Sequence, residues 1–123
     1  TNMLKVHIAA EKVASGKSVT GGRASGSLTR ITDGDLSTLP EGAILSLAAD
    51  FDGEFTGDVT QIAGIIDNGG GLTGYPAVVA RELGIPMLSD ATVPDSIADG
   101  ETISIDAERG IVFDGDVLQS TSR

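Results

Sequence analysis

Residues 67–88 read DNGGGLTGYPAVVARELGIPML, and they carry the clearest structural signals of the chain. It follows directly on an apolar run, Ala63–Asp67, that has the length and composition of a buried strand. Three consecutive glycines at positions 69–71 then allow backbone conformations that other residues avoid. The stretch therefore predicts a strand that ends in a tight glycine turn.

A helix is predicted to follow this turn over Thr73–Leu83. Thr73 or Gly74 can cap its first backbone N–H groups, and Pro76 lies in the first turn, where a missing N–H costs least. Gly84 can adopt the left-handed conformation that ends many helices. Both ends of the helix are thus marked by local signals.

Short strand-like segments dominate the rest of the chain, as alternating or continuous apolar residues between turn residues indicate. The predicted strands are Leu4–Ala9, Ser25–Ile31, Ala43–Ala48, Ala63–Asp67, Thr102–Asp106 and Ile111–Phe113, and a second, shorter helix is predicted within Gly57–Ile62. Gly110 can supply the positive φ of a hairpin between the last two strands. We expect a single α/β domain over residues 1–123, with a largely β core and one or two flanking helices.

The composition limits where the protein can work and which side-chain chemistry it can use. The chain has 123 residues, 40% of them hydrophobic but only 3% aromatic, so its core must consist mainly of aliphatic side chains. It has no cysteine, which excludes disulfides, thiolate metal sites and cysteine nucleophiles. This composition favours a cytoplasmic protein.

The formal net charge of -10 argues against two classes of partner. A nucleic-acid-binding protein needs a basic surface to neutralise phosphates, and an anionic membrane attracts basic residues as well. We therefore expect neither nucleic acid nor membrane as a partner. The carboxylates form either an ordinary acidic surface or an adaptation to a salt-rich cytoplasm, and composition leaves both interpretations open.

The stretch around the predicted helix also carries a resemblance. It is similar to the signature of the phosphohistidine swivelling domain, the mobile domain of PEP-utilising enzymes, in which a Gly-Gly-x-Thr-Ser-His-Ala-Ala-like turn opens a helix ending in Ala-Arg-Glu-Leu-Gly-Ile-Pro. The matching residues are Gly70, Gly71, Thr73, Ala77, Val79, Ala80, Arg81, Glu82, Leu83, Gly84, Ile85 and Pro86. Weaker likenesses at residues 22–26 and 99–112 extend the resemblance over residues 17–115. It implies a swivelling β/β/α fold.

In this family the domain carries phosphate on a histidine and swings between two active sites. A helix N-terminus stabilises a phosphoryl group, and an imidazole nitrogen is a suitable nucleophile near neutral pH. Here Gly74-Tyr75-Pro76 stands where the family has Ser-His-Ala, and the chain's one histidine, His7, is far from the motif. The resemblance therefore implies no catalytic residue and no phosphohistidine carrier activity.

Some pyruvate kinases bear a similar C-terminal extra domain, from which no phosphate transfer is required, and the chain resembles that branch most. The resemblance implies a structural or regulatory domain, excised from or C-terminal to a larger chain. Its partners would be the catalytic domain of the parent enzyme and neighbouring subunits. The domain itself would need no cofactor, whereas the parent kinase would use Mg and K ions. Two alternatives stay open: a stand-alone module that binds a small molecule or anion, and the small swivelling subunit of an aconitase-like dehydratase.

Most candidate binding residues lie at the start of the predicted helix, and Arg81 lies further along it. The candidates are Gly70, Gly71, Thr73, Gly74, Tyr75 and Arg81, which could contact an anion or another domain. Tyr75 is expected in the first turn at the domain surface, either filling the vacated mouth or contacting a neighbour. The acidic stretch DFDGEFTGD at residues 50–58 lacks the ligand spacing of a calcium loop, so no metal site is predicted.

Overall fold

The computed structural model describes residues 11–49, 51, 53–69 and 74–115. The predicted strand Leu4–Ala9 lies outside the described residues. So do His7, Gly70, Gly71 and Thr73.

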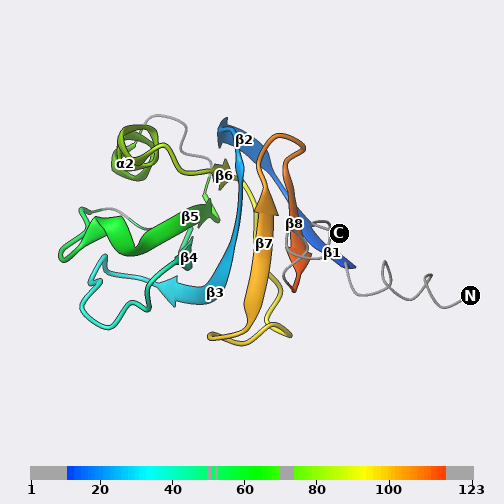
Figure 1. Cartoon of the computed structure of the whole chain (residues 1–123), viewed down its shortest axis with the longest axis horizontal. Coiled ribbons are helices and arrows are strands. Elements are labelled where there is room, and N and C mark those ends of the chain that lie inside the picture. Colours follow the sequence, from blue (N-terminus) through cyan, green and yellow to red (C-terminus); the bar gives the residue numbers. More distant parts are fainter. Residues whose placement is uncertain (1–10, 50, 52, 70–73, 116–123) are drawn as a thin grey trace, which may run out of the picture.

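Eight strands, one α-helix and one 3-10 turn make up the described chain (Figure 1). The elements are β1 Glu11–Ser15, β2 Lys17–Thr20, β3 Arg23–Ile31, β4 Ala43–Leu47, η2 Val59–Gln61, β5 Ile62–Asp67, α2 Tyr75–Leu83, β6 Met87–Ser89, β7 Thr102–Asp106 and β8 Ile111–Asp114. The strand order is β1-β8-β7-β3-β4-β5-β6-β2. Strands β3 to β6 are parallel, and the remaining pairs are antiparallel.

The sheet closes on itself because β1 and β2, at the two ends of this order, are separated in sequence by Gly16 alone. One bent segment therefore pairs with β8 through its first half and with β6 through its second. Strand β3 makes the opposite corner: Arg23–Ser27 pairs with β7, and Leu28–Ile31 pairs with β4. Among the described strands, this closure leaves no long unpaired sheet edge.

Two glycines allow these corners. A Cβ on Gly16 would lie 2.5 Å from the Ser89 carbonyl oxygen and 2.7 Å from the Ala91 Cβ. A Cβ on Gly26 would lie 1.8 Å from the Gly42 carbonyl oxygen. No larger residue fits at either corner, because in both places the obstacle includes backbone.

The core has two parts, one on each face of the parallel strands. Leu28, Ile44 and Ile66 point into the barrel, where they meet residues of β7 and β8. Leu45, Leu47 and Ile65 point to the other face, which α2 covers with its buried residues. The continuous apolar runs of β4 and β5 thus reflect burial on both faces.

The structure confirms most of the predicted architecture. The strands predicted at Ser25–Ile31, Ala43–Ala48 and Ala63–Asp67 agree with β3, β4 and β5 within two residues. The C-terminal hairpin is confirmed, with Gly110 at a φ of 73°. The fold is an α/β domain with a largely β core.

The second helix predicted within Gly57–Ile62 is wrong. Only the 3-10 turn Val59–Gln61 forms there, and β5 begins immediately after it. The Asp58 side chain accepts a hydrogen bond from the Thr60 N–H at 3.0 Å and caps this turn. Two β-branched residues in a row disfavour a longer helix.

Candidate functional site

The start of helix α2 has the geometry of an ordinary capped helix. Gly74 is the N-cap, and its carbonyl oxygen accepts hydrogen bonds from the N–H groups of Ala77 and Val78 at 3.1 and 3.2 Å. Pro76 follows in the first turn, and no side chain of the described residues caps the start of the helix. At the other end, Gly84 adopts the left-handed conformation with a φ of 70°, as predicted.

Tyr75 is the first residue of the helix and is half-buried. Its ring packs edge-on against Phe55, with 5.4 Å between the ring centroids and an angle of 64° between the planes. Phe55 in turn contacts Phe51 at 5.7 Å. The phenol ring therefore rests on an aromatic cluster of the domain itself, and part of its surface stays open to solvent.

Arg81 lies near the other end of α2 and is exposed. Arg81 comes six positions after Tyr75 along the helix, which corresponds to about 9 Å along the helix axis. The helix start and Arg81 thus do not form one compact cluster. Of the remaining predicted binding residues, Gly74 is exposed at the helix start, and the others lie outside the described residues.

The turn after β5 is described as far as Gly69. The Gly69 N–H donates to the Asp67 carboxylate at 2.9 Å, and the Gly69 carbonyl accepts from the Asp90 N–H at 2.7 Å. Partial burial raises the pKa of Asp67, and the hydrogen bond from Gly69 opposes this effect. The carboxylate holds the beginning of the glycine turn in place.

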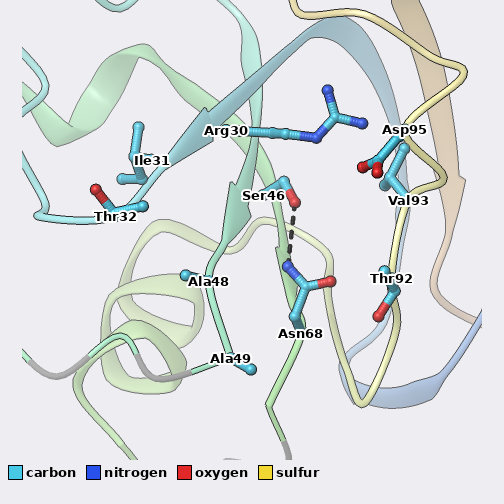
Figure 2. A pocket seen from close by; sticks show the side chains of 10 residues that line it. All are labelled: Arg30, Ile31, Thr32, Ser46, Ala48, Ala49, Asn68, Thr92, Val93 and Asp95. Carbon is cyan, nitrogen blue, oxygen red and sulfur yellow. Dashed lines mark hydrogen bonds between the residues drawn. The ribbon is translucent and has the colours of Figure 1, made fainter.

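A pocket of about 410 Å³ opens at the carboxyl ends of the parallel strands. Its lining consists of Arg30, Ile31, Thr32, Ser46, Ala48, Ala49, Asn68, Thr92, Val93 and Asp95. Figure 2 shows Ser46 and Asn68 at its centre and residues 92–95 on the segment beside them. In open α/β sheets, ligands characteristically bind outside the carboxyl ends of the strands.

The strand period explains how the pocket becomes polar. Ser46 lies two residues beyond Ile44 on β4 and therefore shares its inward face. Asn68 stands in the same relation to Ile66 of β5. The inward-facing side chain thus changes from aliphatic to polar over two residues, from Ile44 to Ser46 and from Ile66 to Asn68.

Asn68 is the most constrained polar group of the pocket. Its Nδ2 donates to the Leu47 carbonyl oxygen and lies 3.4 Å from the Ser46 Oγ. Its Oδ1 is buried and has no hydrogen-bond partner among the described residues. A buried acceptor without a donor costs free energy, so this oxygen marks a place where a donor is expected.

None of these pocket residues was predicted as a site. They come from three strand ends and the 92–95 segment, which only the closed topology brings together. One signal was present in the sequence: Ser46 interrupts the apolar run AILSLA. Within the described ranges, no group of three or more His, Asp or Glu side chains is placed to hold a metal ion. The same residues contain no helix that is long and apolar enough to cross a membrane.

Comparisons with known proteins show which family the chain belongs to. Over 122 residues the chain is 34% identical to a pyruvate kinase of Lactobacillus delbrueckii subsp. bulgaricus, covering 95% of this chain and 20% of that protein. Over 64 residues it is 34% identical to a probable phosphoenolpyruvate synthase of Methanothermobacter thermautotrophicus, covering 51% of this chain and 9% of that protein. The chain thus spans a fifth or less of either relative.

A solved structure has the same fold. The aconitase X of Thermococcus kodakaraensis superposes with a TM-score of 0.59 at 17% identity, over 84% of this chain and 98% of that one. Identity at this level shows the fold alone.

Residues 39–110 match the family described as "PEP-utilising enzyme, mobile domain". This chain is therefore a member of the PEP-utilising enzyme mobile-domain family.

Proposed function

We propose that this chain is a non-catalytic C-terminal domain of a pyruvate kinase and carries no phosphate. The observation behind this proposal is the helix start, where Tyr75 and Pro76 form the first turn in place of the family's histidine motif. The similarity to a pyruvate kinase over 95% of the chain supports the choice of parent enzyme.

The chemistry of the helix start supports the loss of carrier function. A phenol hydroxyl is a weaker nucleophile than an imidazole nitrogen at neutral pH and is a poor acceptor of a phosphoryl group. Pro76 lacks the N–H that a bound phosphate would use. The Tyr75 ring is also held by Phe55, so its place is that of a packing residue.

In this proposal the domain acts by contact with the rest of its enzyme. The outer face of α2 carries Val78, a large hydrophobic side chain that is 45% exposed, together with the exposed Arg81. Tyr75 lies three residues before Val78 on the same helix, so the two are neighbours along its surface. We propose that this face contacts the catalytic domain or a neighbouring subunit. The parent enzyme would act in the cytoplasm. The Mg and K ions of the reaction would belong to the catalytic part, and this domain would need none.

Intact-mass measurement of the full-length enzyme tests the proposal. After incubation with phosphoenolpyruvate, the mass is expected to stay unchanged, while pyruvate kinase activity is present. A phosphoenolpyruvate synthase with the family histidine, treated in parallel, serves as the positive control. A stoichiometric gain of one phosphoryl group that Tyr75→Phe abolishes would contradict the proposal.

The likeness to aconitase X keeps the dehydratase subunit as the second candidate. It rests on fold at 17% identity, whereas the kinase relationship rests on 34% sequence identity. The reading frame of the gene separates the two candidates. A frame continuous with a catalytic kinase domain supports the first, and a separate large dehydratase subunit supports the second.

A further inference from the structure

We propose that the pocket at the barrel mouth binds a small, uncharged, polyhydroxylated molecule such as a sugar or polyol. The pocket lies at the carboxyl ends of β3, β4 and β5, on the inner face of the sheet. Helix α2 covers the opposite face, so this site is distinct from the helix start discussed above. The proposal does not depend on the identity of the parent enzyme.

Arg30 is the one basic side chain among the described residues of the lining. Its Nη1 donates to the Asp99 carboxylate at 3.0 Å, and its Nη2 donates to the Pro94 carbonyl at 2.9 Å. The Arg30 backbone N–H also faces Asp99, at 3.3 Å. Arg30 thus ties the 94–99 segment to β3, and its charge is already compensated within the domain.

Charge then disfavours an anionic ligand. With Arg30 paired, the remaining charged group among the described lining residues is Asp95, which is exposed. The chain as a whole carries a formal charge of -10. A phosphate or carboxylate entering the pocket would meet a negative potential without an available cation. A single exposed carboxylate is also too little to hold a metal ion.

The polar groups that remain call for a ligand rich in hydroxyl groups. Asp95 supplies a carboxylate acceptor. Asn68 Oδ1, which has no donor among the described residues, is buried, so a ligand reaches it only after a small shift of the side chain. Ser46 and Thr92 have hydroxyl groups, which can both donate and accept. Hydroxyl groups on the ligand satisfy such a mixture in both directions.

The apolar part of the lining fits the same class. Ala48, Ala49 and Val93 provide small aliphatic surfaces on which the C–H face of a sugar or polyol can pack. The volume of about 410 Å³ lies near the lower end of the range for small-molecule sites. A monosaccharide-sized ligand in an open pocket of this kind is expected to bind with a dissociation constant on the order of 1 mM.

Titration followed by ¹H–¹⁵N NMR tests the proposal with a matched pair of probes, D-glucose and D-glucose 6-phosphate. We expect D-glucose to shift the amide signals of residues 46–49, 68–69 and 92–95 in a saturable manner. The phosphorylated sugar is expected to bind at least threefold more weakly. Absence of saturable shifts with D-glucose would overturn the site, and tighter binding of the phosphate ester would overturn the ligand class.

Two variants locate the site. Thr92→Val removes a hydroxyl from the exposed rim and should weaken D-glucose binding at least threefold, whereas Thr38→Val, at an exposed position outside the lining, should leave it unchanged. Asp95→Asn keeps an acceptor but removes the negative charge. It should therefore reduce the difference in dissociation constant between D-glucose and D-glucose 6-phosphate. Equal effects of the two threonine variants would contradict the assignment. An unchanged spectrum outside the binding region in each variant confirms that the fold is intact.

Discussion

The sheet can bend at its two corners only because single residues there are glycines, and the closest backbone approach is at Gly26. The Gly26→Ala variant is expected to lose about 3 kcal/mol of unfolding free energy, because the new Cβ would lie 1.8 Å from the Gly42 carbonyl oxygen. Neither backbone can move without disturbing the pairing of β3. Urea denaturation measures the loss.

Gly53→Ala is the matched control, because a Cβ there meets nothing within 4 Å. Its stability should stay within about 0.5 kcal/mol of the parent chain. If both variants unfold at the same urea concentration, the close approach at Gly26 does not limit the fold.

A second residue-scale prediction concerns Asp67, whose pKa is raised by partial burial. The folded state therefore binds a proton more readily than the unfolded state, so ionisation of Asp67 lowers stability as the pH rises through its folded pKa. Asp67→Asn keeps an acceptor for the Gly69 N–H but has no charge. It should stabilise the domain at pH 7 by less than about 1 kcal/mol, since solvent screens a half-exposed group.

The pH dependence separates this effect from a change in packing. The gain from Asp67→Asn should vanish in acid, below the unfolded pKa of a carboxyl group of about 3.9. Thermal denaturation from pH 3 to pH 7 measures the difference. A gain of equal size at every pH would contradict the assignment to ionisation.

Among the helices and strands, those formed by local interactions could be predicted from the sequence, and those formed by contacts between distant segments could not. Helix α2, strands β4 and β5 and the C-terminal hairpin have local signals: caps, apolar runs and Gly110. Strands β1, β2 and β6 are only three to five residues long and were not predicted. Their extended shape depends on pairing with β8, β6 and β5, which lie far away in sequence.

The candidate site divides in the same way. The helix start with Tyr75 was predictable, because its capping and turn residues are contiguous in sequence. The pocket was not, since Ser46 and Asn68 become neighbours only when β4 and β5 pair and the barrel closes. Their separation of 22 residues carries no local signal.

The C-cap of α2 provides an element-scale prediction. Gly84 has a φ of 70°, and a Cβ there would meet nothing within 4 Å, so any cost of substitution comes from the backbone conformation alone. Gly84→Ala should lose about 1 kcal/mol, and Gly84→Asn less, because Asn tolerates the left-handed region better. Equal stabilities of the alanine and asparagine variants in urea would indicate that the helix end shifts instead.

At the scale of the whole molecule, charge is distributed differently from apolar surface. The aliphatic core is divided between the barrel interior and the α2 face, whereas most ionised groups of the described residues are exposed. Asp106 is an exception: it is buried, and both Arg23 and Arg109 approach it at 3.6 Å. The net charge of -10 therefore acts mainly through the surface, where dissolved salt can reach it.

This distribution predicts a salt-dependent stability. Raising potassium chloride from 0.1 to 1 M shortens the screening length from about 10 to about 3 Å and weakens the repulsion among exposed carboxylates. A gain of about 1 kcal/mol would raise the Tm of a domain of this size by roughly 3–6 °C. Sucrose at equal osmolality controls for effects that do not depend on charge. The combined variant Glu41→Gln, Glu54→Gln, Glu82→Gln removes three exposed negative charges and should respond less steeply to the salt. An equally steep response of the variant, or a flat curve for the parent chain, would leave an ordinary acidic surface as the interpretation of the carboxylate excess.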